Sequence, residues 1–356
     1  MKRDRILMCG NEACGEGAVI AGCRFYAGYP ITPQNELTAY MAKRMLELGG
    51  TFIQAESELA AINMVFGASV AGARAMTSSS SPGISLKQEG ISYIAGCGLP
   101  AVIVNVMRGG PGLGNIAPSQ ADYFQATRGG GHGDYRTIVL APASVQEVVE
   151  LTRDAFGLAD EYRMPVMVLS DGMLGQMMEP VDLVAANKAE VGKRSVEKPW
   201  ALTGCKDREP NMIRSLLLKS GALEDWNNEL QARYKTIEEK EVRYEALHED
   251  ESDLIIIGYG TCGRIAKSCV ERARDEGLSV GMIRPITLWP FPKDIVRKAA
   301  EKAKAILVVE MSSGQMIEDV QLAIGERCKI EFYGRPGGAV PEEDVIFEKI
   351  RTLVSG

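Results

Sequence analysis

Hydrophobic positions in the first half of the chain come in short runs, separated by longer amphipathic or small-residue stretches. This alternation is typical of strands and helices that follow one another in a parallel sheet with helices on its faces. The runs that predict strands are residues 23–29, 51–55, 73–78, 101–107, 137–141 and 165–170. Ser144, followed by Glu147, forms a capping-box pattern that predicts the start of a helix running to Tyr162. We therefore expect residues 1–182 to form an α/β domain.

The pattern changes after this region. Residues 183–252 are charged and amphipathic, for example at 227–246, and they lack the β-branched runs of the first region. We expect them to form a partly helical connector. From residue 253 the alternation resumes, with strands predicted at 254–259, 279–284, 305–310 and 329–333. This predicts a smaller second α/β domain over residues 253–356, and the length of the chain is sufficient for two cores.

Composition and charge narrow the class of protein. The formal net charge is −7, which argues against a nucleic-acid partner, because such proteins usually display a basic face. No apolar stretch approaches the length of a membrane span or of a secretory signal, so we expect a cytoplasmic protein with no membrane partner. The eight cysteines include no CxxC pair. We therefore expect no metal ion and no iron–sulfur cluster to be bound by this chain.

Candidate chemistry lies where the predicted strands end. The loops there read GYPITP at 28–33, ESE at 56–58, SSSSPG at 78–83 and RGGPGLG at 108–114. Because ligands of open parallel sheets bind at the carboxyl ends of the strands, the candidate residues are Thr32, Glu58 and Arg108. Singly, each has a structural explanation, since Glu58 at a helix start suits the helix dipole and Arg108 is compatible with a solvated surface charge. Together, in loops of small residues, they predict a ligand site.

The amino-acid sequences of these loops resemble those of a known family. The strings YAGYPITPQNE, QAESELAAINMVFGASVAGARAMTSSSSPG, VNVMRGGPG and MIRPITLWPFP look like the α subunit of 2-oxoacid:ferredoxin oxidoreductases, and the similarity spans essentially the whole chain. The strings SSSSPGISLKQEGISY, RGGPGLG and ATRGGGHGDYR are most similar to the branched-chain type, which acts on 3-methyl-2-oxobutanoate (2-ketoisovalerate). The 2-oxoglutarate type shares the catalytic pieces and is the alternative.

The resemblance implies a fold and an activity. It implies a thiamine-diphosphate-binding pyrimidine domain at residues 1–182 and a transketolase-C-like domain at 253–356. Members of this family decarboxylate a 2-oxoacid on thiamine diphosphate and form acyl-CoA from CoA. They pass two electrons through iron–sulfur clusters to ferredoxin. We therefore expect this chain to be part of an oxidoreductase.

The resemblance also implies roles for individual residues. Glu58 matches the glutamate that contacts the aminopyrimidine ring nitrogen, where a desolvated carboxyl group promotes proton transfer on the cofactor. Tyr29 and Pro30 belong to the same cofactor site. Arg108 matches the arginine that holds the substrate carboxylate, for which a planar guanidinium is well suited. Thr32 matches the threonine that hydrogen-bonds the substrate. Glu56, two residues earlier, is the alternative candidate for the role of Glu58.

One expected motif is missing. Thiamine enzymes hold the diphosphate through Mg²⁺ with a Gly-Asp-Gly motif, and the nearest strings here, Ser170-Asp171-Gly172 and Gly133-Asp134-Tyr135, do not match it. We therefore expect Mg²⁺ and the diphosphate to be bound by a partner β subunit. Ferredoxin-like and γ subunits would hold the iron–sulfur clusters and pass electrons to ferredoxin. The isolated chain is expected to be inactive.

Two other classes of function stay open at this point. The string GYGTCG at 258–263 has the form GxGxxG after a predicted strand, which would suit an NADP-binding oxidoreductase with Arg284 on the 2′-phosphate. The second alternative class is a non-catalytic assembly subunit. It is also open whether His132 and the serine loop at 78–81 contact a ligand, or whether they are solvated and turn-forming.

Overall fold

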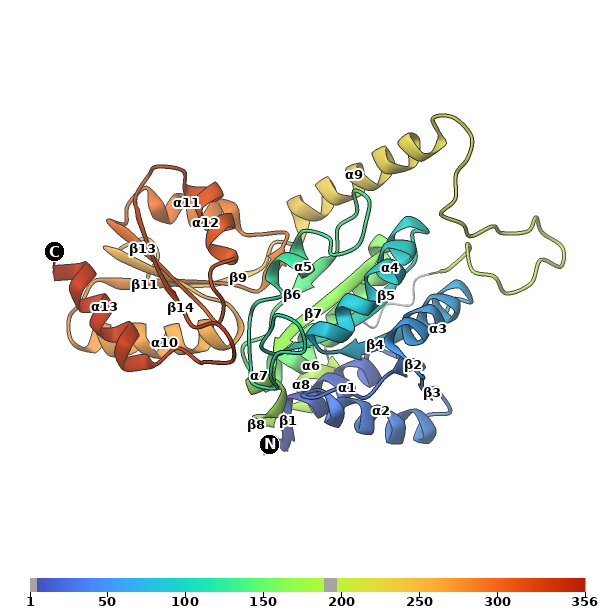
Figure 1. Ribbon diagram of the computed structural model, residues 1–356, viewed down its shortest axis with the longest axis horizontal. Helices are drawn as coiled ribbons and strands as arrows, with labels where there is room; N and C mark the ends of the chain where they lie inside the picture. Colours follow the sequence, from blue (N-terminus) through green and yellow to red (C-terminus); the bar gives the residue numbers. More distant parts are fainter. Residues whose placement is uncertain (1–4, 189–196, 356) are drawn as a thin grey trace.

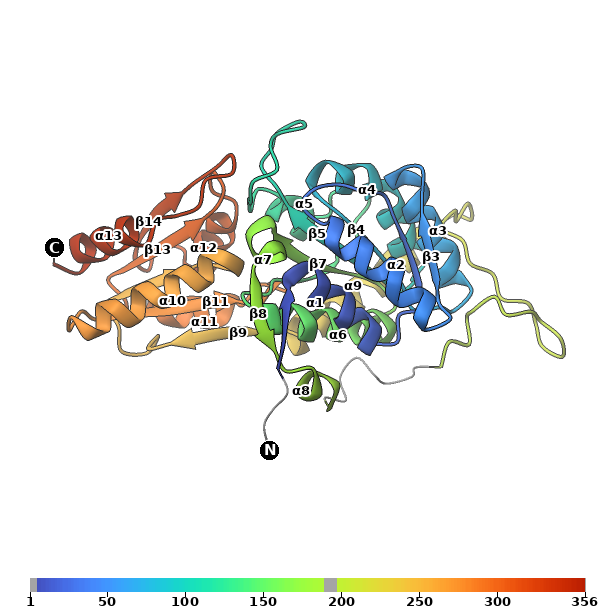
Figure 2. The same ribbon diagram turned by 90° about the horizontal axis from the view of Figure 1, so that it is seen from below.

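A computed structural model describes residues 5–188 and 197–355, and it forms two α/β units side by side (Figures 1 and 2). The larger unit contains a seven-stranded sheet in the order β12-β6-β7-β5-β4-β2-β3. Its parallel strands are β2 (Phe25–Gly28), β3 (Thr51–Gln54), β4 (Ala75–Ser79), β5 (Ala101–Met107), β6 (Ile138–Leu140) and β7 (Pro165–Asp171). Each strand predicted for this region is present, with ends shifted by a few residues. The central strands β5 and β7 are buried along their whole length, as expected for a sheet covered on both faces.

Helices cover both faces of this sheet (Figures 1 and 2). The helices α1 (Gly10–Ile20), α2 (Asn35–Glu47) and α6 (Val145–Tyr162) lie on one face, and α3 (Glu58–Val70) and α4 (Ser81–Gly96) lie on the other. Shorter helices are α5 (Tyr123–Thr127), α7 (Gly172–Gln176) and α8 (Leu183–Lys188). A ribbon of two antiparallel strands, β1 (Ile6–Cys9) and β8 (Met178–Val181), was not predicted. Among the described residues, every helix is too short or too polar to cross a lipid bilayer.

The helix predicted from Ser144 is α6. The Ser144 hydroxyl accepts a hydrogen bond from the Glu147 backbone N–H at 3.2 Å, as a capping residue does. The Glu147 carboxylate accepts from Ala143 N–H at 2.8 Å, so the second half of the capping box is displaced by one residue. The same carboxylate binds Arg284 at 2.6 and 3.0 Å, which ties the first unit to the second.

The second unit contains a five-stranded sheet in the order β14-β13-β10-β11-β9. Its strands are β9 (Tyr244–Leu247), β10 (Leu254–Ile257), β11 (Val280–Pro285), β13 (Ala305–Glu310) and β14 (Lys329–Gly334), and its helices are α10 (Gly260–Asp275), α11 (Lys293–Ala300), α12 (Met316–Ile324) and α13 (Glu343–Ser355). The four predicted strands are present. Two strands were missed: β9, antiparallel to β11, and β12 (Thr287–Trp289), which returns to the first sheet and pairs with β6.

The segment between the two sheets covers the first unit. Residues 197–221 form an irregular arm, part of which extends away from the body (Figure 1), while its beginning packs on the first unit, where Leu202 N–H donates to Val70 O at 3.0 Å. The helix α9 (Ala222–Lys240) then packs along the first unit, where Trp226 Nε1 donates to Gly96 O at 2.8 Å and Arg233 Nη1 donates to Tyr162 O at 3.0 Å. The amphipathic segment 227–246 is helical only as far as Lys240, because its last residues join β11 as strand β9.

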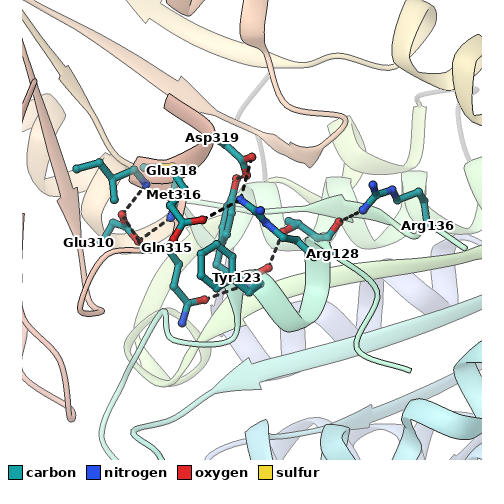
Figure 3. Close-up of polar contacts among 11 residues, drawn as sticks. Tyr123, Arg128, Arg136, Glu310, Gln315, Met316, Glu318 and Asp319 are labelled. Atoms are coloured by element: carbon teal, nitrogen blue, oxygen red, sulfur yellow. Dashed lines mark hydrogen bonds and ion pairs between the residues drawn. The ribbon is translucent and has the colours of Figure 1, made fainter. Parts of the chain in front are cut away.

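A polar interface joins the two units, between α5 and α12 (Figure 3). Tyr123 donates a hydrogen bond to Asp319 at 2.6 Å, and Arg128 lies 3.3 Å from the same carboxylate. Gln315 donates to Ala121 O at 2.7 Å. Burial, together with the neighbouring Asp319 charge, raises the pKa of Tyr123 well above its ordinary value. Tyr123 therefore stays protonated and donates this hydrogen bond. The polar interface between α5 and α12 holds the two units in a defined arrangement.

Candidate functional site

The predicted site residues follow strands that are neighbours in the sheet. Strands β5, β4, β2 and β3 are adjacent and parallel, so their carboxyl ends lie at one edge. The loops 28–33, 55–58, 79–83 and 108–114 all leave from this edge. The geometric expectation drawn from the strand exits is therefore met.

Arg108 and Thr32 lie in direct contact. Arg108 is 6% exposed, and its Nη1 donates to the Thr32 backbone carbonyl at 2.9 Å. Its Nη2 donates to Leu113 O at 3.1 Å, while its Nε is buried and has no hydrogen-bond partner in the described part of the chain. One N–H on each terminal nitrogen and the Nε–H are thus available to a ligand. The Thr32 hydroxyl accepts from Asn35 Nδ2 at 3.3 Å and can still donate.

A buried network fixes the backbone at Arg108. The Ser81 hydroxyl accepts from Arg108 N–H at 3.0 Å and donates to the Asp122 carboxylate at 2.6 Å. Asn105 Nδ2 also donates to Asp122, at 2.9 Å. Burial raises the pKa of Asp122, and these two hydrogen bonds partly oppose that effect. Ser81 therefore links the start of α4 to the end of β5.

Glu58 is the first residue of α3, and the neighbouring Ser57 caps the helix by accepting from Ala60 N–H at 3.1 Å. Glu58 is 6% exposed, and its carboxylate receives no hydrogen bond within residues 5–188 and 197–355. It lies against Gly83 in the first turn of α4. A Cβ added to Gly83 would lie 2.6 Å from Glu58 Oε1 and closer still to Ser79 Oγ. The Glu58 side chain is thus largely buried, and its carboxylate faces a small cradle.

The structure brings some of the predicted residues together more closely than others. Thr32 and Arg108 are joined directly, whereas Glu58 lies across the turn at 79–83 and makes no hydrogen bond to either. Tyr29, at 39% exposed, and Pro30 lie on the rim of the same edge. Glu56, the local rival of Glu58, is exposed. Of the two carboxylates, Glu58 is therefore the desolvated one.

The sequence left open whether the serine loop at 78–81 and His132 contact a ligand, and the structure places these residues differently. Ser78 donates to Gln34 Oε1 at 2.6 Å and so belongs to the protein's own network. Among the described residues, the buried hydroxyls of Ser79 and Ser80 have no hydrogen-bond partner, and that of Ser79 lies near Glu58, at Gly83. His132 is exposed, and its backbone carbonyl accepts from Ser92. The side chain of His132 thus lies in solvent in this structure.

Sequence reasoning missed a buried lysine at this site. Lys87 on α4 is 0% exposed, and its Nζ donates to Thr77 Oγ1 at 2.5 Å and to Ser78 O at 3.2 Å. Burial lowers the pKa of Lys87 to about 7, and the negative charge of Glu58 acts in the opposite direction. The available signal was its position four residues after Gly83, on the same helix face.

Comparison with known proteins decides the family. Residues 16–248 match the family described as pyruvate flavodoxin/ferredoxin oxidoreductase, thiamine diP-bdg, and residues 252–346 match pyruvate:ferredoxin oxidoreductase core domain II. The chain belongs to the 2-oxoacid:ferredoxin oxidoreductase family, as an α-type subunit. The predicted family and fold class are thereby confirmed.

The relatives of this α-type subunit include subunits of ketoisovalerate oxidoreductases and subunits of 2-oxoglutarate synthases. It is 51% identical to the ketoisovalerate oxidoreductase subunit VorB of Methanothermobacter thermautotrophicus, over 97% of this chain and 96% of that one. It is 40% identical to the 2-oxoglutarate synthase subunit KorA of Archaeoglobus fulgidus, over 92% and 94%. A solved 2-oxoglutarate:ferredoxin oxidoreductase from Magnetococcus marinus superposes with a TM-score of 0.89 and 28% identity. That match covers 99% of this chain and 66% of the other.

In this α-type subunit the GxGxxG loop has a structural use. The loop opens helix α10, and its Thr261 hydroxyl donates to the buried Asp171 carboxylate of the first unit at 2.7 Å. Gln120 Nε2 donates to Tyr259 O at 2.8 Å, and a Cβ on Gly260 would lie 3.3 Å from the same amide. A dinucleotide phosphate would need the helix terminus that Asp171 occupies. The loop therefore docks the two units together.

The residues at the strand edge fit the pyrimidine part of thiamine diphosphate. Glu58 offers a buried carboxyl group that has no partner among the described residues, and the unpartnered Ser79 hydroxyl lies beside it. A polar heteroaromatic ring would supply hydrogen bonds to both groups. Within the described ranges, His, Cys, Asp and Glu side chains form no group of three that could hold a metal ion. The prediction that this chain binds no metal is not tested by this observation.

Proposed function

We propose that this chain forms the cofactor-activating part of a thiamine-diphosphate-dependent 2-oxoacid:ferredoxin oxidoreductase. The reaction converts a 2-oxoacid and CoA to acyl-CoA and CO₂, and two electrons pass to ferredoxin. The observation that carries the proposal is the buried, unpartnered Glu58 at the edge where Arg108 and Thr32 meet. A buried carboxyl group without a partner is costly, so it is expected at a site that a ligand completes.

Each residue has a distinct task. Thiamine diphosphate, when bound, supplies a nucleophilic carbon and an electron sink for the decarboxylation. Glu58 holds a proton at the aminopyrimidine ring nitrogen, with Tyr29 and Pro30 on the rim of that site. Arg108 binds the substrate carboxylate through its free N–H groups, and the Thr32 hydroxyl donates to the substrate. The Ser81 network keeps Arg108 in place.

For the substrate we propose 3-methyl-2-oxobutanoate. Arg108 is the one cationic side chain in the loops 28–33, 55–58, 79–83 and 108–114. It can pair with the carboxylate next to the oxo group, but these loops offer no second cation for the distal carboxylate of 2-oxoglutarate. The nearby Leu113 and Ile116 are exposed and apolar. The VorB relative, at 51% identity, supports the same choice. The KorA relatives and the superposed structure keep 2-oxoglutarate as the second candidate.

The proposed enzyme needs partner subunits. A β subunit would bind Mg²⁺ and the diphosphate, and ferredoxin-like and γ subunits would hold the iron–sulfur clusters. The exposed apolar side chains of Met212, Leu216 and Leu218 on the arm suit contact with such subunits. The cytoplasmic location expected from the sequence stays a prediction.

Reconstitution of the complex tests the function. Ferredoxin reduction is measured with 3-methyl-2-oxobutanoate and with 2-oxoglutarate, in the presence of CoA. Glu58→Gln should lower kcat by about 10²- to 10⁴-fold, as expected when a general acid–base group is lost. Glu56→Gln is the matched control, because Glu56 is exposed two residues away, and it should keep kcat. Full turnover of the Glu58→Gln complex would refute the proposed role. A higher kcat/KM for 2-oxoglutarate would replace the proposed substrate.

A further inference from the structure

Lys87 is a buried cation that the proposed reaction does not yet use. Its side chain is 0% exposed, and both of its hydrogen-bond acceptors, Thr77 Oγ1 and Ser78 O, belong to strand β4. Within the described part of the chain, Lys87 has no carboxylate within ion-pair distance. A lysine in the core without an ion pair is costly, and its retention needs a reason.

The geometry relates Lys87 to Glu58. Gly83 and Lys87 are four residues apart on α4 and so lie on one face of the helix. The Gly83 part of this face lies against the Glu58 carboxylate and the Ser79 hydroxyl. The Lys87 amine is held by Thr77 and Ser78, which directly precede Ser79 on β4. Thr77 and Ser79 share one face of β4, so the amine and the carboxylate both lie at the end of this strand, on the face that α4 covers.

Glu58 is also the charged group that acts on Lys87. Burial lowers the pKa of Lys87 to about 7, and the Glu58 charge is the sole Coulombic influence that accompanies burial. The other charges at this end of α4 are Arg108 and Asp122, which meet the helix at Ser81. They are engaged in their own hydrogen bonds. The strand β4 contributes uncharged groups, Thr77 and the Ser78 carbonyl.

We propose that Lys87 is a positioning residue for Glu58: its buried amine, held at the end of β4, provides a positive field beside the Glu58 carboxylate without forming a direct ion pair. A direct ion pair would occupy the carboxylate oxygens that the proposed function assigns to the cofactor. A charge held slightly farther away stabilises the carboxylate and leaves its oxygens free. This role rests on the proposed task of Glu58. Lys87 itself touches neither substrate nor cofactor.

The first experiment needs no activity. In the full chain, lysine side chains labelled with ¹³C are titrated by NMR, and the Lys87 signal is assigned by its absence in Lys87→Met, or in Lys87→Gln if that variant folds better. We expect a titration midpoint near neutral pH. In Glu58→Gln the midpoint should fall by at least about half a pH unit, because the charge that favours the ammonium is lost. A midpoint that is unchanged in Glu58→Gln would overturn the proposal.

The second experiment uses the reconstituted complex. Lys87→Met removes the positive field beside Glu58, so the acid limb of the kcat profile of this variant should move to higher pH, by at least about half a unit. Lys43→Met, at an exposed position on α2, is the control and should leave the profile in place. An acid limb that stays in place in Lys87→Met contradicts the proposal.

The two experiments separate two kinds of failure. If Glu58→Gln keeps full turnover, the proposed function fails, whatever Lys87 does. If Glu58→Gln is inactive but the Lys87 midpoint does not respond to it, the function stands and the role of Lys87 fails.

Discussion

Gly83 is the position where a single methyl group tests the arrangement of the site. A Cβ at residue 83 would lie 2.6 Å from Glu58 Oε1 and within contact distance of Ser79 Oγ, so both side chains must move. Overpacking of this kind costs about 1–3 kcal/mol. Replacing a helical glycine with alanine returns about 1 kcal/mol. Gly83→Ala should therefore lower the free energy of unfolding by about 0–2 kcal/mol, the difference of these two effects.

The effect on catalysis should be much larger than the effect on stability. A displacement of Glu58 by about 1 Å is expected to lower turnover about 10²-fold. The assay is ferredoxin reduction by the reconstituted complex, with urea unfolding of the full chain measured in parallel. A Gly83→Ala complex with unchanged kcat would refute the claim that Glu58 must occupy this cradle.

Gly67 provides the matched control. It lies inside α3, and an added Cβ there would meet nothing within 4 Å. Gly67→Ala should raise the free energy of unfolding by about 0.5–1 kcal/mol and leave kcat unchanged. Adding Ser79→Ala to Gly83→Ala removes the nearer of the two clashing oxygens and should recover part of the stability. Failure of that recovery would show that the loss arises elsewhere.

Three further outcomes are expected. Arg108→Lys should raise KM for the 2-oxoacid by roughly tenfold or more, because an ammonium lacks the planar fork that binds a carboxylate; an unchanged KM would remove Arg108 from the substrate site. Thr261→Val removes a donor from the buried Asp171 carboxylate and should lower the free energy of urea unfolding by about 1.5–3 kcal/mol. Because the pKa of Lys87 is lowered to about 7 in the folded chain, the unfolded chain binds more protons between pH 7 and the usual lysine pKa of about 10.4. Lys87 therefore destabilises the fold below pH 7, and wild-type stability should rise with pH across this window relative to Lys87→Met, by up to about 1.4 kcal/mol per pH unit. Parallel pH dependences of the two proteins would argue against a buried, titrating lysine.

Most strands that the sequence revealed have a marked apolar run, although β3 and β14 were also predicted and are only partly buried. The central strands β5 and β7 are apolar except for Asn105 and the final Ser170 and Asp171, and such runs are easily recognised. The strands that were missed are short and antiparallel, and their partners are distant in the chain. Strand β9 mixes polar and apolar residues in four positions, and β12 is three residues long. Nothing local distinguishes such segments from loops, because their pairing is decided by tertiary contacts.

The site could be predicted in part for a similar reason. Parallel topology places the strand exits at one edge, so the shared edge of Thr32, Glu58 and Arg108 could be expected from their positions, while their roles stay proposals. The residues that support them were not. Ser81 binds Asp122 across 41 positions, and Lys87 became significant only when α4 was seen to pack beside Glu58. Supporting contacts of this kind depend on how helices dock, which the local pattern does not encode.

Carboxylates at helix N-termini show how structural and functional roles can be told apart in this protein. Asp171 accepts from the backbone N–H groups of Met173 and Leu174 at the start of α7, and Glu310 accepts from those of Met316 and Ile317 at the start of α12. Both carboxylates satisfy helix donors that would otherwise be exposed, so their burial is explained by the fold. Glu58 also stands at a helix start, but Ser57 supplies the cap and leaves the Glu58 carboxylate without a donor among the described residues. The Glu58 carboxylate does not cap its own helix, so the fold alone does not explain its burial. Glu58 is therefore the residue to test first.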